Sequence, residues 1–147
     1  MNKIFIGLLI SFIIFEINCF AYQTKNVLLK NNIVIEVQAT ETLQEKKLGL
    51  GKRDSLTKNT GMIFVYNSPG NRIFWMKGMR FKIDIIWILK GKVAHIVKNI
   101  SPPSIMTPDN RLPVYGSGVI ADMVLEVPAG YSDKIDLKIN DSVLVNP

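Results

Sequence analysis

Ile83-Asp84-Ile85-Ile86-Trp87-Ile88-Leu89 is the stretch of this sequence that decides the fold. Apart from Asp84 and Leu89, its residues are β-branched or aromatic, the types that are enriched in β-strands. Lys90-Gly91-Lys92 follows as a turn, and residues 93–100 return as a second strand. This region therefore predicts two strands joined by a tight turn.

Short apolar runs of the same kind lie on both sides of this pair. Asn31-Asn32 separates two of them and predicts a β-hairpin. Asn67-Ser68-Pro69-Gly70-Asn71 predicts a turn, after which residues 73–76 pair back on residues 61–66. Many short strands favour a mostly β, compact single domain, a β-sandwich or partly closed barrel with one or two short helices. The remaining predicted strands are residues 27–29, 33–37, 123–127 and 142–145.

Helical and loop signals are few. Thr42 with Glu45 three residues later is a capping-box pattern, which predicts a short helix over residues 42–48. Pro128-Ala129-Gly130 predicts the start of a short turn or helix. Residues 101–113, the proline loop, contain four prolines. Long ordered loops are often functional, so we expect this one to form the rim of a site.

The first residues are typical of an export signal. Lys3 precedes an apolar run over residues 4–15, which is too short to span a bilayer but fits a signal-peptide core. We expect a signal peptide over residues 1–21, cleavage after Ala21, a single β-rich domain over residues 22–147, and a periplasmic or extracellular location. Two alternatives stay open: lipidation of Cys19, and an uncleaved N-terminal anchor.

Composition limits the chemistry of the expected mature chain. The only Cys of the sequence is Cys19, which lies in the expected leader. Disulfides, thiolate catalysis and Cys-based zinc sites are therefore not expected in the mature chain. The net charge is +6, but the lysines are dispersed, and no basic stripe suggests a nucleic-acid partner. His95 and Ser117 lack the frame of a serine triad, and the methionines fall mostly in apolar runs. We expect no metal, no cofactor and a monomer.

Several short motifs occur in a characteristic order. They are Leu48-Gly49-Leu50-Gly51-Lys52-Arg53, Gly61-Met62-Ile63-Phe64-Val65-Tyr66, Phe74-Trp75-Met76-Lys77, Ile83-Asp84-Ile85, Tyr115, Leu125-Glu126-Val127 with Gly130, and Ile139-Asn140-Asp141. Over about residues 33–145 the chain resembles the bacterial domain-of-unknown-function family number 192. The resemblance implies a small β-rich domain, often exported, with no settled activity.

The candidate ligand-binding face centres on the segment from Phe74 to Asp84. Trp75 and Lys77 have the same parity on a strand and would point the same way, where an aromatic plane beside an ammonium could hold a sugar or an anion. The plainer interpretation is that Trp75 covers the core edge while the Lys77 stem lies along it. The full candidate face is Trp75, Lys77, Asp84, Tyr115 and Glu126.

Asp84 lies in an apolar strand and would need a cationic or hydrogen-bonding partner if it faced the core, with Lys77, Arg80 and Arg53 as candidates. Otherwise it points to solvent. The sequence leaves three functions open. The first is a non-enzymatic envelope module that binds a small ligand or an envelope protein. The second is a small hydrolase or carbohydrate-active enzyme using Asp84 or Glu126, and the third is an accessory factor for an envelope assembly.

Overall fold

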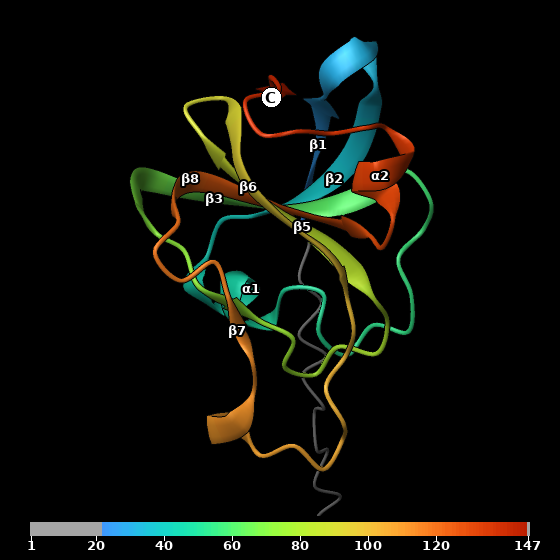
Figure 1. The fold of residues 1–147 in the computed structure, drawn as a ribbon, viewed down its shortest axis with the longest axis vertical. Coiled ribbons are helices and arrows are strands. Elements are labelled where there is room, and N and C mark those ends of the chain that lie inside the picture. Colours follow the sequence, from blue (N-terminus) through green and yellow to red (C-terminus); the bar gives the residue numbers. More distant parts are fainter. Residues whose placement is uncertain (1–21, 147) are drawn as a thin grey trace, which may run out of the picture.

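A curled, seven-stranded sheet in the order β6-β5-β8-β3-β2-β1-β9 forms the body of the protein (Figure 1). This computed structural model describes residues 22–146, so the expected leader and Cys19 lie outside the described residues. The strands of this sheet are β1 (Gln23–Leu28), β2 (Val34–Thr40), β3 (Thr60–Asn71), β5 (Ile83–Leu89), β6 (Lys92–Ile100), β8 (Ile120–Pro128) and β9 (Leu144–Asn146).

The two predicted strands at Ile83–Leu89 and residues 93–100 are confirmed as the antiparallel pair β5 and β6. Lys90 and Gly91 both have positive φ, 50° and 71°, as a two-residue hairpin turn of the I′ type requires. β5 also pairs with β8, so it has neighbours on both sides, and its first six residues are buried. A strand covered on both faces needs the near-continuous apolar run seen here.

A short crossover connects β2 to β3, which pair in parallel. It contains α1 (Leu43–Leu48), and the predicted capping box is confirmed. The Thr42 side chain accepts a hydrogen bond from the Glu45 backbone N–H, and the Glu45 carboxylate accepts one from the Thr42 N–H at 2.8 Å. These bonds satisfy backbone donors that a helix start leaves unpaired, so they fix where α1 begins.

The predicted turn at residues 67–71 is wrong. β3 runs on through these residues to Asn71 and stays paired with β8, with a register shift between Val65 and Gly70. Pro69 falls inside this irregularity, where a strand tolerates a residue that lacks a backbone N–H. β4 (Phe74–Trp75) accordingly does not return along β3 but pairs with β7 (Val114–Tyr115) as a separate two-stranded sheet.

Both faces of the large sheet carry a core. On β8, Leu125 and Val127 belong to one apolar cluster, which β1, β2 and the chain around α2 (Tyr131–Lys134) complete. Val124, two residues before Glu126, belongs to the other cluster, which Leu50, Met76 and the small sheet cover. The fold prediction, a mostly β partly closed barrel with short helices, is confirmed. None of the described helices is long and apolar enough to cross a membrane.

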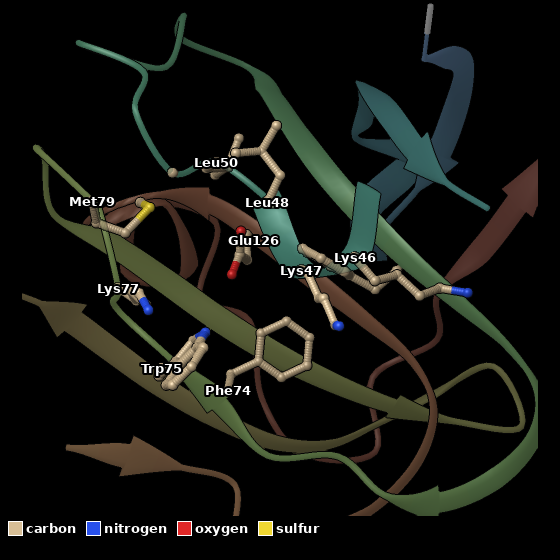
Figure 2. Close-up of a pocket in the computed structure, with 12 residues that line it drawn as sticks. Lys46, Lys47, Leu48, Leu50, Phe74, Trp75, Lys77, Met79 and Glu126 are labelled. Carbon is tan, nitrogen blue, oxygen red and sulfur yellow. The ribbon is translucent and has the colours of Figure 1, made fainter. Parts of the chain in front are cut away.

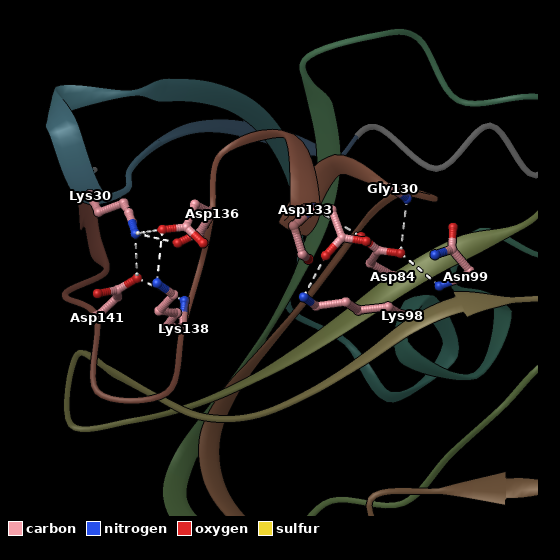
Figure 3. Close-up of polar contacts among 10 residues, drawn as sticks. Lys30, Asp84, Lys98, Asn99, Gly130, Asp133, Asp136, Lys138 and Asp141 are labelled. Atoms are coloured by element: carbon pink, nitrogen blue, oxygen red, sulfur yellow. Dashed lines mark hydrogen bonds and ion pairs between the residues drawn. The ribbon is translucent and has the colours of Figure 1, made fainter.

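Ion pairs fix the chain that follows α2 onto the first hairpin (Figure 3). Lys30, in the 3-10 turn η1 (Lys30–Asn32), contacts the carboxylates of Asp136 and Asp141, the second at 3.3 Å. Lys138 contacts Asp136 as well, at 3.0 Å. Its side-chain hydrogen bond is the main cause of the lowered pKa of Asp136. The network is on the surface, so its role is positioning rather than a large gain in stability.

Candidate functional site

Glu126 is a carboxyl side chain embedded in the second core. It lies near the end of β8, opposite Met62 of β3 and Ile85 of β5, and is 5% exposed. Its Oε2 atom has no hydrogen-bond partner among residues 22–146. Buried carboxyl oxygens are normally hydrogen-bonded, and leaving one unpaired costs free energy. A residue kept in this state is a candidate functional group.

The protein shifts the protonation of this carboxyl strongly. Burial raises the pKa of Glu126 to about 8, and the positive charge of Arg53 only partly opposes the shift. Burial has this effect because it disfavours the charged form. At neutral pH the Glu126 carboxyl therefore carries a proton, and it can donate a hydrogen bond as well as accept one.

Glu126 lies at the base of a small pocket (Figure 2). The walls come from α1, the loop that follows it, and β4 with the residues after it. The cavity measures about 30 Å³, the size of one water molecule or one small functional group. We call it the Glu126 pocket; its lining is Lys46, Lys47, Leu48, Gly49, Leu50, Gly51, Phe64, Phe74, Trp75, Lys77, Met79 and Glu126.

Glycines let the backbone pass close over this carboxyl. Gly49 ends α1 with φ 50° and ψ −134°, a conformation that other residues rarely adopt. A Cβ atom there would lie 3.3 Å from the Phe64 ring and 4.0 Å from Oε2 of Glu126. A Cβ at Gly51 would lie 2.8 Å from the Leu48 carbonyl oxygen. The motif Gly49-Leu50-Gly51 is thus required by close packing at the pocket wall.

Three lysines surround the pocket. Lys46 and Lys47 come from the last turn of α1, and Lys77 follows β4. The Lys77 ammonium lies 5.3 Å from the centre of the Trp75 ring, close enough for a cation–π contact, and it forms an ion pair with Asp109. The Lys46 ammonium points away from Glu126 (Figure 2): it donates a hydrogen bond to the Glu41 carbonyl oxygen at 3.2 Å and lies 4.9 Å from the centre of the Tyr66 ring. With a protonated carboxyl below and Lys47 and Lys77 in its lining, the pocket is complementary to an anion. Glu126 is the one carboxyl group among the described lining residues.

Asp84 lies outside the Glu126 pocket and has a structural role (Figure 3). It is opposite Val127 in the β5–β8 register, whereas Glu126 is opposite Ile85, so the two carboxyls lie on opposite faces of the sheet. Asp84 is completely buried and accepts hydrogen bonds from three backbone N–H groups, those of Asn99 at 2.8 Å, Gly130 at 3.1 Å and Ser132 at 2.9 Å. The expectation that a core-facing Asp84 needs a hydrogen-bonding partner is confirmed, but the donors are backbone N–H groups rather than Lys77, Arg80 or Arg53. The alternative, that Asp84 points to solvent, is wrong.

Tyr115 is also outside the pocket. It is opposite Phe74 in the small sheet, and its half-buried side chain packs on the second core. Trp75 is opposite Val114 on the outer side and is 46% exposed. Of the five residues predicted from sequence, the structure brings together Trp75, Lys77 and Glu126, and it separates Asp84 and Tyr115 from them.

Comparison with known proteins identifies the family. The sequence profile described as "Uncharacterized ACR" matches residues 26–145. The chain belongs to domain-of-unknown-function family 192 (DUF192). The resemblance noted from the sequence motifs is therefore confirmed, while the family brings no activity with it.

Two solved structures have the same fold as this DUF192 domain. A proposed transcription regulator from Sinorhizobium meliloti 1021 is 20% identical with a TM-score of 0.74, over 86% of this chain and 96% of that one. A protein of unknown function from Novosphingobium aromaticivorans is 25% identical with a TM-score of 0.70, over 84% of each chain. No curated protein matches significantly.

Sequence reasoning missed the α1 side of the site in this DUF192 domain. In the sequence alone, Lys46 and Lys47 count among dispersed lysines, and Gly49 and Gly51 belong to a family motif without a predicted role in a site. The crossover that brings α1 over β8 depends on parallel pairing of β2 with β3, which no local pattern reveals. The available signal was the clustering of two lysines and two glycines around one short helix.

Proposed function

We propose that this protein is a small-ligand-binding domain that works outside the cytoplasm, and that the Glu126 pocket binds a carboxylate group. The observation that carries the proposal is the buried Oε2 of Glu126, which has no hydrogen-bond partner among the described residues and lies in a pocket that Lys47 and Lys77 line. Non-polar surroundings keep the Glu126 carboxyl protonated at neutral pH. A protonated carboxyl donating to a carboxylate is a short, charge-assisted hydrogen bond.

Lys77 and Trp75 support the same assignment. The Lys77 ammonium would pair with the second oxygen of the bound carboxylate, and the exposed Trp75 ring would shield the pair from water. The export-like leader supports a periplasmic or extracellular site of action for a monomeric domain. The likeness to a proposed regulator, at 20% identity, supports the fold alone and gives no reason to propose a nucleic-acid partner.

The test compares acetate with methylammonium at equal ionic strength and pH 6.5, using the natively processed protein. Acetate should raise the melting temperature, because a ligand of the native state stabilises it by mass action, and methylammonium should not. Lys77→Met should abolish the acetate effect. Lys58→Met, at an exposed lysine that lines none of the described pockets, is the matched control and should keep it. Equal shifts with both ions would contradict the proposal.

A second candidate is a hydrolase in which Glu126 acts as general acid. The raised pKa favours it, because a carboxyl that stays protonated near pH 7 can donate a proton. Glycoside hydrolysis commonly needs a second carboxylate, and the described pocket lining contains one carboxyl only. Glu126→Gln separates the candidates: the amide can still donate a hydrogen bond to a ligand, but it cannot transfer a proton. Turnover that Glu126→Gln abolishes would establish the enzyme.

A further inference from the structure

A second, larger hollow adjoins the Glu126 pocket. It lies between residues 77–80, which follow β4, and the proline loop, and it measures about 570 Å³. Pockets for small molecules commonly measure roughly 300–1,000 Å³, so this volume suits a ligand with a backbone of many atoms. We call it the proline-loop groove. Lys77 and Met79 line both hollows, so the two hollows lie side by side at these residues.

The groove has an apolar wall and a cationic end at Lys77, and its lining also contains Lys52, Arg80 and Asp109. Pro103, Ile105 and Leu112 line it from the proline loop, and Met79 lines it from the other side. Ile105 is 99% exposed, which is unusual for an isoleucine and leaves its whole side chain available to a ligand. Lys77 stands where the groove meets the Glu126 pocket.

The loop is suited to form a binding wall before any ligand arrives. Its four prolines, at positions 102, 103, 108 and 113, each fix one backbone angle and reduce the freedom of the chain. The 3-10 turn η2 (Asp109–Arg111) places Asp109 against Lys77, which ties the loop to the β4 side. A preformed wall lowers the entropy lost when a ligand binds.

We infer that the ligand is an amphipathic carboxylate, whose carboxylate binds between Glu126 and Lys77 and whose apolar chain lies along the proline-loop groove. The inference rests on the proposed function and adds the nature of the rest of the molecule. Charge sets the direction in which the ligand lies: its carboxylate fits the cationic end of the groove, and its methylene groups fit the apolar wall. Asp109 competes with the ligand for Lys77, so Asp109→Asn should raise the affinity for acetate, which does not contact the loop wall.

The test is a titration of the natively processed protein at pH 6.5 with acetate, butyrate, hexanoate and octanoate, and with 1-octanol. Each methylene group buried should raise the affinity about two- to fourfold, so octanoate should bind far more tightly than acetate. 1-Octanol should bind much more weakly than octanoate. Ile105→Ser and Leu112→Ser should lower the octanoate affinity and leave acetate unchanged.

The matched control is Met106→Ser, since Met106 is 85% exposed and does not line the groove. Because Ile105 is almost fully exposed, Ile105→Ser tests the groove even where Leu112→Ser affects folding. Equal affinities for acetate and octanoate would overturn this inference and leave the proposed function standing. No binding of either would overturn both. If both groove variants bind octanoate as tightly as the unmodified protein, the assignment of the groove is wrong. If 1-octanol binds as tightly as octanoate, the assignment of the carboxylate head group is wrong.

Discussion

The two buried carboxyls show how position decides the role of a residue. Asp84 and Glu126 lie on the paired strands β5 and β8 of one sheet, and both are buried. Asp84 is surrounded by backbone N–H donors, so its oxygens are satisfied and it holds loops together. Glu126 is surrounded by apolar side chains and opens into a pocket. We therefore expect structural effects from changes at Asp84 and functional effects from changes at Glu126.

Asp84→Ala should destabilise the fold without affecting the ligand site. It would leave three backbone N–H groups without their acceptor, each costing about 1–3 kcal/mol. We expect the free energy of unfolding to fall by several kcal/mol (on the order of 3). Urea unfolding measures this loss. If Asp84→Ala unfolds like the unmodified protein, the three-bond assignment is wrong.

Glu126 should make the protein less stable as pH rises. Its pKa is about 8 in the folded state, against the ordinary value of 4.5. Between these values the unfolded chain has lost the proton and the folded chain has kept it, so stability falls with rising pH and levels off above about pH 8. The total loss is on the order of a few kcal/mol.

The measurement is the free energy of unfolding at pH 5 and pH 8.5 in the unmodified protein and in Glu126→Gln. Gln does not titrate, so this variant should lose that part of the pH dependence. All other titrating groups are shared, and they cancel in the comparison. Identical pH slopes in the two proteins would show that Glu126 ionises normally.

At the scale of elements, local patterns predicted what depends on neighbours in sequence. The capping box gave α1, and the β-branched run gave β5 with its hairpin partner β6. The continuation of β3 through Pro69 depends instead on β8, whose Ile120 and Ala121 pair with Asn71 and Gly70. The local preference of these residues for a turn is outweighed by pairing with a strand about fifty positions later in the sequence.

The loop after α1 offers a test at this scale. Gly49→Ala should destabilise the protein by about 1–3 kcal/mol, because Gly49 has a backbone conformation that alanine adopts only with strain. It should also weaken acetate binding, since the added methyl group would press on Phe64 beside Glu126. Gly118→Ala, with φ 81° and no atom within 4 Å of the added Cβ, controls for positive φ alone. Equal acetate affinity in both variants would argue against a tight loop over the pocket.

At the scale of the whole molecule, the two faces of the large sheet have different roles. One face packs on β1, β2 and the chain around α2, and it supplies a core of ordinary aliphatic side chains. The other face packs on α1, β4 and β7, and it contains Glu126, whose buried Oε2 has no hydrogen-bond partner among the described residues. Because side chains alternate between the two faces of a strand, the sequence of β5 and β8 indicates which residues share a face. The elements that cover each face are remote in sequence, so the site was predictable only in part.

The proposed site of action also has a test on the whole chain. Expressed with its own leader, the protein should be recovered outside the cytoplasm with Tyr22 as its first residue, since cleavage is expected after Ala21. Intact-mass spectrometry of the recovered protein decides this. A lipid-modified N-terminus at Cys19 would instead establish a membrane-anchored lipoprotein, and a cytoplasmic chain starting at Met1 would contradict export.

The central claim is that a protonated Glu126 binds a carboxylate, and its most direct measurement is the acetate affinity as a function of pH. In the unmodified protein, the affinity should be steady near pH 6 and fall about tenfold for each unit well above pH 8, as Glu126 loses its proton. In Glu126→Gln the affinity should stay constant over this range, because the amide remains a donor. A parallel fall in both proteins, or no fall in either, would contradict the account.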